Sequence, residues 1–108
     1  MNPALFLEQW FGRRRSLSPD VIVSVIDLVV VVVGAGGTPR RALDLVAARG
    51  PIEVAVPLSE LMANTRAGWS TRDVLIALPE ILGDDLRPLA AALLSAERDG
   101  APIGVLLG

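Results

Sequence analysis

The feature that most constrains the fold is the apolar stretch of residues 18–37, SPDVIVSVIDLVVVVVGAGG, which contains five consecutive valines. Valine is β-branched and favours strands, but both ends of this stretch carry helix signals. Ser18 is a good N-cap, Pro19 suits the first helical position, and Asp20 compensates the positive end of a helix dipole. The glycines at residues 34, 36 and 37 are typical of the chain just past a helix C-terminus.

The polar residues of this stretch decide between strand and helix. Asp20, Ser24 and Asp27 are spaced by four and three residues, which places them on one face of a helix. A strand would put Asp20 and Asp27 on opposite faces. We therefore predict a helix over residues 19–33 that is buried on most of its circumference and has one narrow polar stripe.

A membrane interpretation of the same stretch is weaker. Three arginines before an apolar run are typical of a signal peptide or a membrane anchor, and here they are Arg13, Arg14 and Arg15. The uninterrupted apolar part, residues 28–33, has only six residues, whereas a spanning helix needs about 20. Asp27 would also be costly within lipid. We interpret residues 19–33 as a core helix.

Composition adds constraints on partners. The chain has 108 residues, enough for one domain with a single core, and 52% of them are hydrophobic. This high fraction favours an exposed surface that meets another subunit or a membrane-embedded part. The formal net charge of −2 gives no basic footprint for nucleic acid. We therefore expect protein partners and no nucleic acid.

Residue types suited to catalysis or metal binding are scarce. The chain has no cysteine and no histidine, which excludes disulfides and thiolate sites and removes the commonest general base and metal ligand. The adjacent acids Asp84 and Asp85 follow Gly83 and precede an apolar segment, a position typical of helix capping. The run GAGG lacks the Lys-Ser/Thr of a phosphate loop. We predict that the protein is not an enzyme and has no metal or cofactor.

The N-terminal arm, residues 1–17, combines aromatic and basic residues. Its first twelve residues form either a short amphipathic helix or an irregular arm between Pro3 and Gly12. Aromatic rings followed by arginines suit a membrane interface, whereas a flap over the core or a disordered terminus is the alternative. The residues expected to lie near a membrane are Trp10, Phe11, Arg13, Arg14 and Arg15.

Four further segments follow the apolar helix. Thr38 and Pro39 begin a helix that runs to about residue 49. Residues 52–56 alternate like a strand, but a single strand without a partner is unstable. We therefore predict a loop there, leading into a helix from about Pro57 to Arg66. Two more helices are predicted, one capped by Ser70 and kinked near its end by a proline, the other running from residues 84–85 to 98–99.

A period of 32 residues links these pieces. It relates Gly36, Gly68 and Gly100, then Thr38 and Ser70, and finally Leu43, Leu75 and Leu107. Each block has a helix, a glycine stop, a short turn and a capped helix, which is the pattern of an αα-hairpin. Three such hairpins predict an all-α fold for residues 18–108, an antiparallel bundle of about six helices.

Several segments follow the helix–glycine–helix pattern of a known family. They are PDV at 19–21, DL at 27–28, GAGGTPRRAL at 34–43, RAGWSTRDVL at 66–75, LGDDLRPL at 82–89 and SAERDGAP at 95–102. Through them, residues 18–108 resemble the type II secretion system F-domain family, and within it the Tad/Flp pilus branch. These motifs mark helix boundaries and carry no catalytic signature.

The resemblance implies a six-helix domain on the cytoplasmic face of the bacterial inner membrane. Such domains belong to platform proteins of type II secretion systems, type IV pili and Tad/Flp pili. The implied role is a non-enzymatic scaffold that couples a cytoplasmic ATPase motor to pilin movement, with self-association and contacts to other inner-membrane components. Family members carry transmembrane helices after this domain, whereas this sequence stops at Gly108 without any.

A free-standing helical adaptor or regulator is the alternative function. In that interpretation the hairpin of residues 68–82 imitates a helix-turn-helix. The segment that would read DNA, residues 71–82, carries Arg72 against Asp73 and Glu80, and this acidic balance disfavours DNA binding.

The last complete helix supplies the candidate contact surface. With its leucines turned inward, its other side carries Arg87, Ala91, Ser95 and Arg98. Arg87 and Arg98 are eleven residues apart, which is three turns and ~16 Å, so they point the same way. The small residues between them let another helix approach, and the arginines suit carboxylates of a partner. An ordinary solvated face is the alternative.

Overall fold

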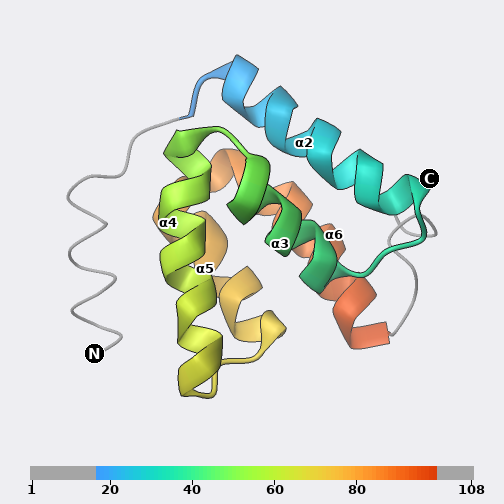
Figure 1. Ribbon diagram of the computed structural model, residues 1–108, viewed down its shortest axis with the longest axis vertical. Helices are drawn as coiled ribbons and strands as arrows, with labels where there is room; N and C mark the ends of the chain where they lie inside the picture. Colours follow the sequence, from blue (N-terminus) through green and yellow to red (C-terminus); the bar gives the residue numbers. More distant parts are fainter. Residues whose placement is uncertain (1–16, 100–108) are drawn as a thin grey trace.

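The computed structural model describes residues 17–99, which form five α-helices and two short 3₁₀ turns and contain no strand. The elements are α2 (Pro19–Gly34), α3 (Pro39–Arg49), α4 (Ile52–Ala63), η1 (Asn64–Ala67), α5 (Thr71–Leu82), η2 (Asp84–Leu86) and α6 (Arg87–Asp99). Consecutive helices pack in an antiparallel manner around one apolar core, and α2 lies along one side of the bundle (Figure 1). The predicted all-α bundle is confirmed for these residues, with five helices. The third predicted hairpin extends into residues 100–108, which lie outside the described part.

Helix α2 forms despite its valines because both of its ends are closed and one side is buried. The Val21 N–H donates to Ser18 Oγ at 3.3 Å, and Pro19 occupies the first position. At the other end the Gly37 N–H donates to the Val32 carbonyl at 2.9 Å. A Cβ on Gly37 would collide with the Val32 side chain, so this turn requires glycine. Valine costs a helix up to ~0.7 kcal/mol, whereas burying one contributes ~1.5–3 kcal/mol.

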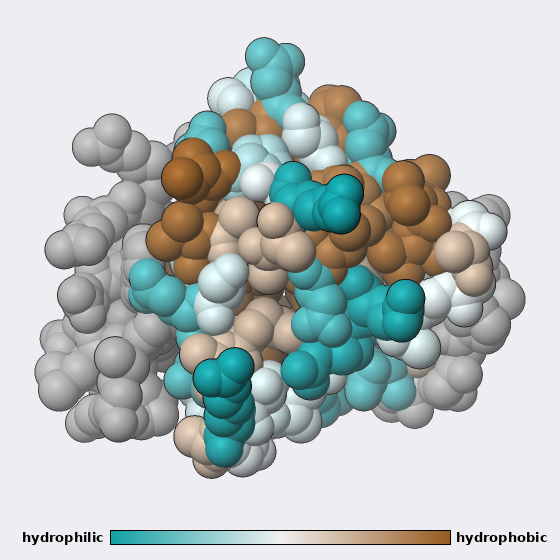
Figure 2. All heavy atoms as spheres, viewed as in Figure 1, coloured by the Kyte–Doolittle hydropathy of each residue, from teal (hydrophilic) through white to brown (hydrophobic). Residues whose placement is uncertain are grey.

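The predicted burial of α2 on most of its circumference is wrong. The stripe that faces the core consists of Val21, Val25, Val29 and Val32. Four apolar side chains on the remaining surface are exposed, namely Val23 at 55%, Ile26 at 42%, Val30 at 56% and Val31 at 63%. The cause is the outer position of α2, which packs mainly on α3, and Figure 2 shows hydrophobic residues on the surface over its C-terminal half. Asp20, Ser24 and Asp27 are exposed, as the predicted polar stripe requires.

The predicted loop over residues 52–56 is also wrong. Helix α4 begins at Ile52, and the Pro51 carbonyl accepts two N–H groups of its first turn. The helix ends at Ala63 rather than Arg66, and the turn η1 carries the chain on to Gly68, whose φ of 107° requires glycine.

Burial explains why α4 includes a proline. Pro57 has no N–H, so one carbonyl in the first turn of α4 loses its intrahelical donor. Against this loss, four buried residues at helical spacing form one stripe: Val54, Pro57, Leu58 and Leu61. The alternation of apolar residues at 52–56 led to the wrong prediction because Ile52 and Val56 do not face the core. They are exposed, at 72% and 46%.

Two of the predicted caps, those at Thr38 and Ser70, are confirmed, whereas Asp84 and Asp85 lie in the 3₁₀ turn before α6, a turn that has no side-chain cap hydrogen bond. Thr38 caps α3 by accepting the Arg41 N–H at 3.3 Å. Ser70 and Asp73 cap α5 reciprocally: Ser70 Oγ accepts the Asp73 N–H at 3.2 Å, and Asp73 Oδ2 accepts the Ser70 N–H at 2.9 Å. Helix α6 ends at Asp99, as predicted.

The 32-residue period is reflected in burial. Leu43 and Leu75, which it relates, are 3% and 0% exposed, so both belong to the core. Leu107, the third member, lies outside the described residues. The largest fully buried side chains are Leu58, Leu61, Leu75, Leu86, Leu93, Val54 and Val74.

Candidate interaction surfaces

The described residues of the predicted strip on α6 are exposed or half-buried. Arg87 and Ala91 are exposed and Ser95 is half-buried, while the side chain of Arg98 is outside the described part. The opposite side of this segment is buried, through Leu86, Ala90, Leu93 and Ala96. The sequence therefore assigned the outward side correctly for the two residues nearest the start of α6.

The structure shows that Arg87 already has acidic partners. Its Nη2 lies 2.8 Å from Asp84 Oδ1 and 3.5 Å from Glu80 Oε1, and its Nε donates to Asp84 Oδ1 at 3.3 Å. The hydrogen bond to Asp84, together with the charges of Asp84 and Glu80, raises the pKa of Arg87. The Glu80 contact ties α5 to the start of α6. A partner carboxylate at Arg87 must therefore compete with two acids of the same chain.

Sequence reasoning missed this arrangement although part of it was visible. Asp84 stands three residues before Arg87, a spacing that favours an ion pair on a helical turn. Glu80 is on another helix, and its approach follows from the sharp return at Gly83, where φ is 110°.

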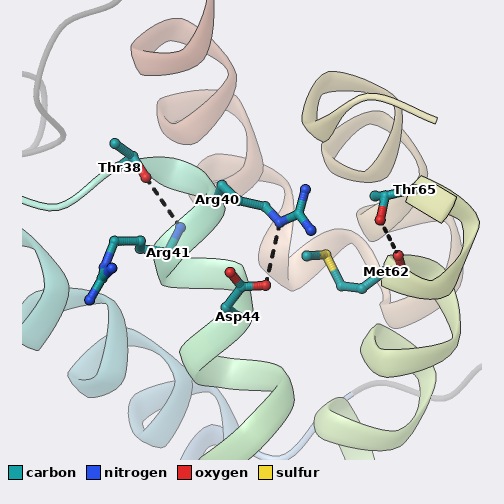
Figure 3. A network of polar contacts seen from close by, with 6 residues as sticks. All are labelled: Thr38, Arg40, Arg41, Asp44, Met62 and Thr65. Carbon is teal, nitrogen blue, oxygen red and sulfur yellow. Dashed lines mark hydrogen bonds and ion pairs between the residues drawn. The ribbon is translucent and has the colours of Figure 1, made fainter. Parts of the chain in front are cut away.

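A second surface is the groove between α3 and α4. Its lining includes Arg40, Asp44, Ala47, Ser59, Met62 and Arg66. Figure 3 shows Met62 of α4 extending toward the Arg40–Asp44 pair on α3. The Arg40 Nε lies 3.4 Å from Asp44 Oδ1, with both side chains about half exposed, so this pair contributes little stability.

Hydrogen bonds to the backbone fix the walls of this groove. Ser59 Oγ donates to the Ala47 carbonyl at 3.4 Å and joins α4 to α3. Thr65 Oγ1 donates to the Met62 carbonyl at 2.7 Å and holds the end of α4 (Figure 3). The groove combines apolar, hydroxyl and charged side chains, a mixture that also occurs in protein interfaces.

The third surface is the outer side of α2, with its four exposed apolar residues. Sequence reasoning placed these residues in the core. The signal that could have found them is the high hydrophobic fraction, which indicated an exposed apolar surface without locating it. A contiguous apolar row on a helix is more informative than single exposed residues, which are normal on any protein.

The remaining predictions concern the N-terminal arm, membrane spans, metal sites and ligand pockets. Trp10, Phe11, Arg13, Arg14 and Arg15 lie outside the described residues. Within residues 17–99, no helix combines the length and apolar character needed to cross a membrane. The same part of the chain holds no group of three or more acidic side chains placed to bind a metal ion. A small apolar gap in the core, with a volume of about 10 Å³, is far smaller than a ligand pocket.

Comparison of the chain with family models, with curated proteins and with solved structures found no match.

Proposed function

We propose that this chain is the cytoplasmic scaffold domain of an inner-membrane platform protein, acting in pilus assembly or type II-like secretion. The observation that carries the proposal is the outer side of α2, where apolar residues remain exposed on a domain that already has a closed core. A helix in this state is suited to binding another protein. The helix–glycine–helix residues add support, because the caps at Thr38 and Ser70 stand at equivalent positions of successive hairpins.

The proposed role is mechanical. The domain transmits movement of a cytoplasmic ATPase motor to pilins at the cytoplasmic face of the inner membrane, and it associates with itself and with other inner-membrane components. In this proposal, attachment to the membrane comes from transmembrane helices of the platform protein. None of these steps requires catalysis by the domain.

The helix-turn-helix alternative is less well supported by the geometry of α5. Most of its side chains are buried: Val74, Leu75, Ala77, Leu78, Pro79, Ile81 and Leu82. A recognition helix must present a free polar face to the major groove. Of the residues left on α5, Arg72 is the only basic one, and Asp73 stands beside it.

The test is capture of the cognate ATPase by the purified chain, together with deletion of the gene. The chain, immobilised on a resin, should retain the pilus or secretion ATPase and not an unrelated cytoplasmic ATPase of similar size. Deletion should abolish surface pili or the secreted substrate. Absence of capture combined with normal assembly in the deletion strain would contradict the proposal, and sequence-specific DNA binding would favour the regulator.

The strip on α6 enters this proposal as one contact surface. Replacing Arg87 and Arg98 together with Glu should leave the domain folded, because Arg87 is exposed and its ion pairs are at the surface. The double variant should show weaker self-association in sedimentation or weaker ATPase capture. Unchanged binding by the folded variant would remove this strip from the proposal.

A further inference from the structure

Three exposed residues on α2 form a regular row, which we call the outer seam: Val23, Ile26 and Val30. Their spacing of three and then four residues is that of the core positions of a heptad repeat. Val33, three residues further on, is partly buried and continues the row toward the core. Helix α2 thus carries two apolar stripes. One is buried in the bundle, and the other has the periodicity by which helices pack together.

Two carboxylates border the outer seam. Asp20 and Asp27 are exposed and lie seven residues apart, about 10 Å along the same side of the helix. Within the described residues, neither carboxylate has an ion pair or a side-chain hydrogen bond. Asp20 compensates the dipole of the first turn. Asp27 is in the third turn, where no such role exists, so its charge is available to a partner.

This combination argues against a second copy of α2 as the occupant. An antiparallel pair centred on Ile26 would bring the Asp27 carboxylates of both copies onto one edge, where like charges repel. A bilayer is also unsuited, because Asp27 would enter it together with the apolar side chains. A helix that has basic residues beside its own apolar row satisfies both the packing and the charge.

We propose that the outer seam binds an amphipathic helix of a partner protein, with Arg or Lys residues flanking its apolar row. The apolar side chains of that helix pack on Val23, Ile26 and Val30, and one of its basic residues pairs with Asp27. Two helices that pack along such apolar rows associate in the manner of a coiled coil. The inference rests on the proposed scaffold function, for which it names the chemistry of a partner.

The probe is a fluorescent synthetic peptide of three heptads, with Leu at the two core positions, Arg at the flanking positions and Ala elsewhere. A matched peptide has Glu in place of each Arg. Repulsion between like charges keeps either peptide from pairing with itself. Fluorescence anisotropy with the full chain should show binding of the Arg peptide that weakens as salt is raised. The Glu peptide should bind at least about tenfold more weakly.

Variants of the protein locate the binding. Val30→Glu should abolish binding without unfolding the domain, because this side chain is 56% exposed. Asp27→Asn should weaken binding roughly two- to fivefold and reduce its salt dependence. The control is Ile76→Glu on α5, a side chain that is 50% exposed away from the seam. That variant should bind the Arg peptide as the original chain does.

Several results would overturn the inference. They are equal binding of the two peptides, binding of neither, and undiminished binding by Val30→Glu. Self-association in sedimentation that Val30→Glu removes would assign the seam to a second copy instead. ATPase capture is scored separately. If the chain captures the ATPase but does not bind the peptide, the inference about the seam is wrong and the proposed function stands. If it binds the peptide but does not capture the ATPase, the proposed function is wrong and the peptide-binding seam stands.

Discussion

The contributions of the buried and exposed sides of α2 to stability can be measured separately by replacing two valines that stand two positions apart. Val29 is 3% exposed and Val31 is 63% exposed. Removing the two methyl groups of Val29 forfeits about 1.6 kcal/mol of burial, and the cavity adds on the order of 1 kcal/mol. Alanine returns up to ~0.7 kcal/mol of helix propensity. Val29→Ala should therefore lower the free energy of unfolding by about 2 kcal/mol.

For the same change at Val31, the lost burial and the gained helix propensity nearly cancel. About a third of this residue is covered, so the lost burial is only ~0.6 kcal/mol. The gain in helix propensity is of similar size. Val31→Ala should thus leave the free energy of unfolding within ~0.5 kcal/mol of the original chain.

The assay is urea denaturation followed by far-ultraviolet circular dichroism, with the slope of the transition compared among the proteins. In thermal unfolding, the Val29 change should lower the midpoint by on the order of 10 °C. Equal destabilisation by both substitutions would refute the reasoning, because it would mean that both sides of α2 are covered in the protein.

Three further predictions concern the caps, the core and the turns, and each is checked by chemical denaturation. Ser70→Ala should cost about 1 kcal/mol, because it removes one half of the reciprocal cap of α5. Leu75→Asp should prevent folding, since it places an unpaired charge at a fully buried position, whereas Arg40→Ala should cost less than ~1 kcal/mol at its exposed ion pair. Gly68→Ala should cost roughly 1–2 kcal/mol because φ is positive there, whereas Gly34→Ala, in open space at ordinary φ, should be neutral or stabilising.

Local signals in the sequence were sufficient to predict several helix caps and one glycine stop, although they predicted neither end of α4. Ser18, Thr38 and Ser70 act as caps because a hydroxyl at that position accepts an N–H two or three residues later, whatever the rest of the fold does. Glycine at position 68 ends its segment because few other residues adopt positive φ. These rules depend on neighbouring residues only, so they transfer from sequence to structure.

The two largest errors arose where contacts between residues distant in the sequence determine the structure. Residues 52–56 read as a loop because Pro57 lacks an N–H and the apolar residues alternate, yet packing of Val54 and Leu58 into the core favours the helix. For α2, the sequence showed where the polar stripe is. It did not show how much of the remaining circumference the other helices cover. Val29 and Val31 are chemically identical, and only the position of α2 at the side of the bundle separates them.

The exposed apolar row on α2 gives its polar residues a second role, in the choice of a binding partner. On a helix buried nearly all round, Asp27 would only mark the side that meets water. On a helix with an exposed apolar row, its charge disfavours pairing of two identical copies of α2 and favours a basic helix. In the proposed function, self-association through the α6 strip and binding of a basic helix at the seam use separate surfaces. We therefore expect one domain to bind a copy of itself and a different partner at the same time.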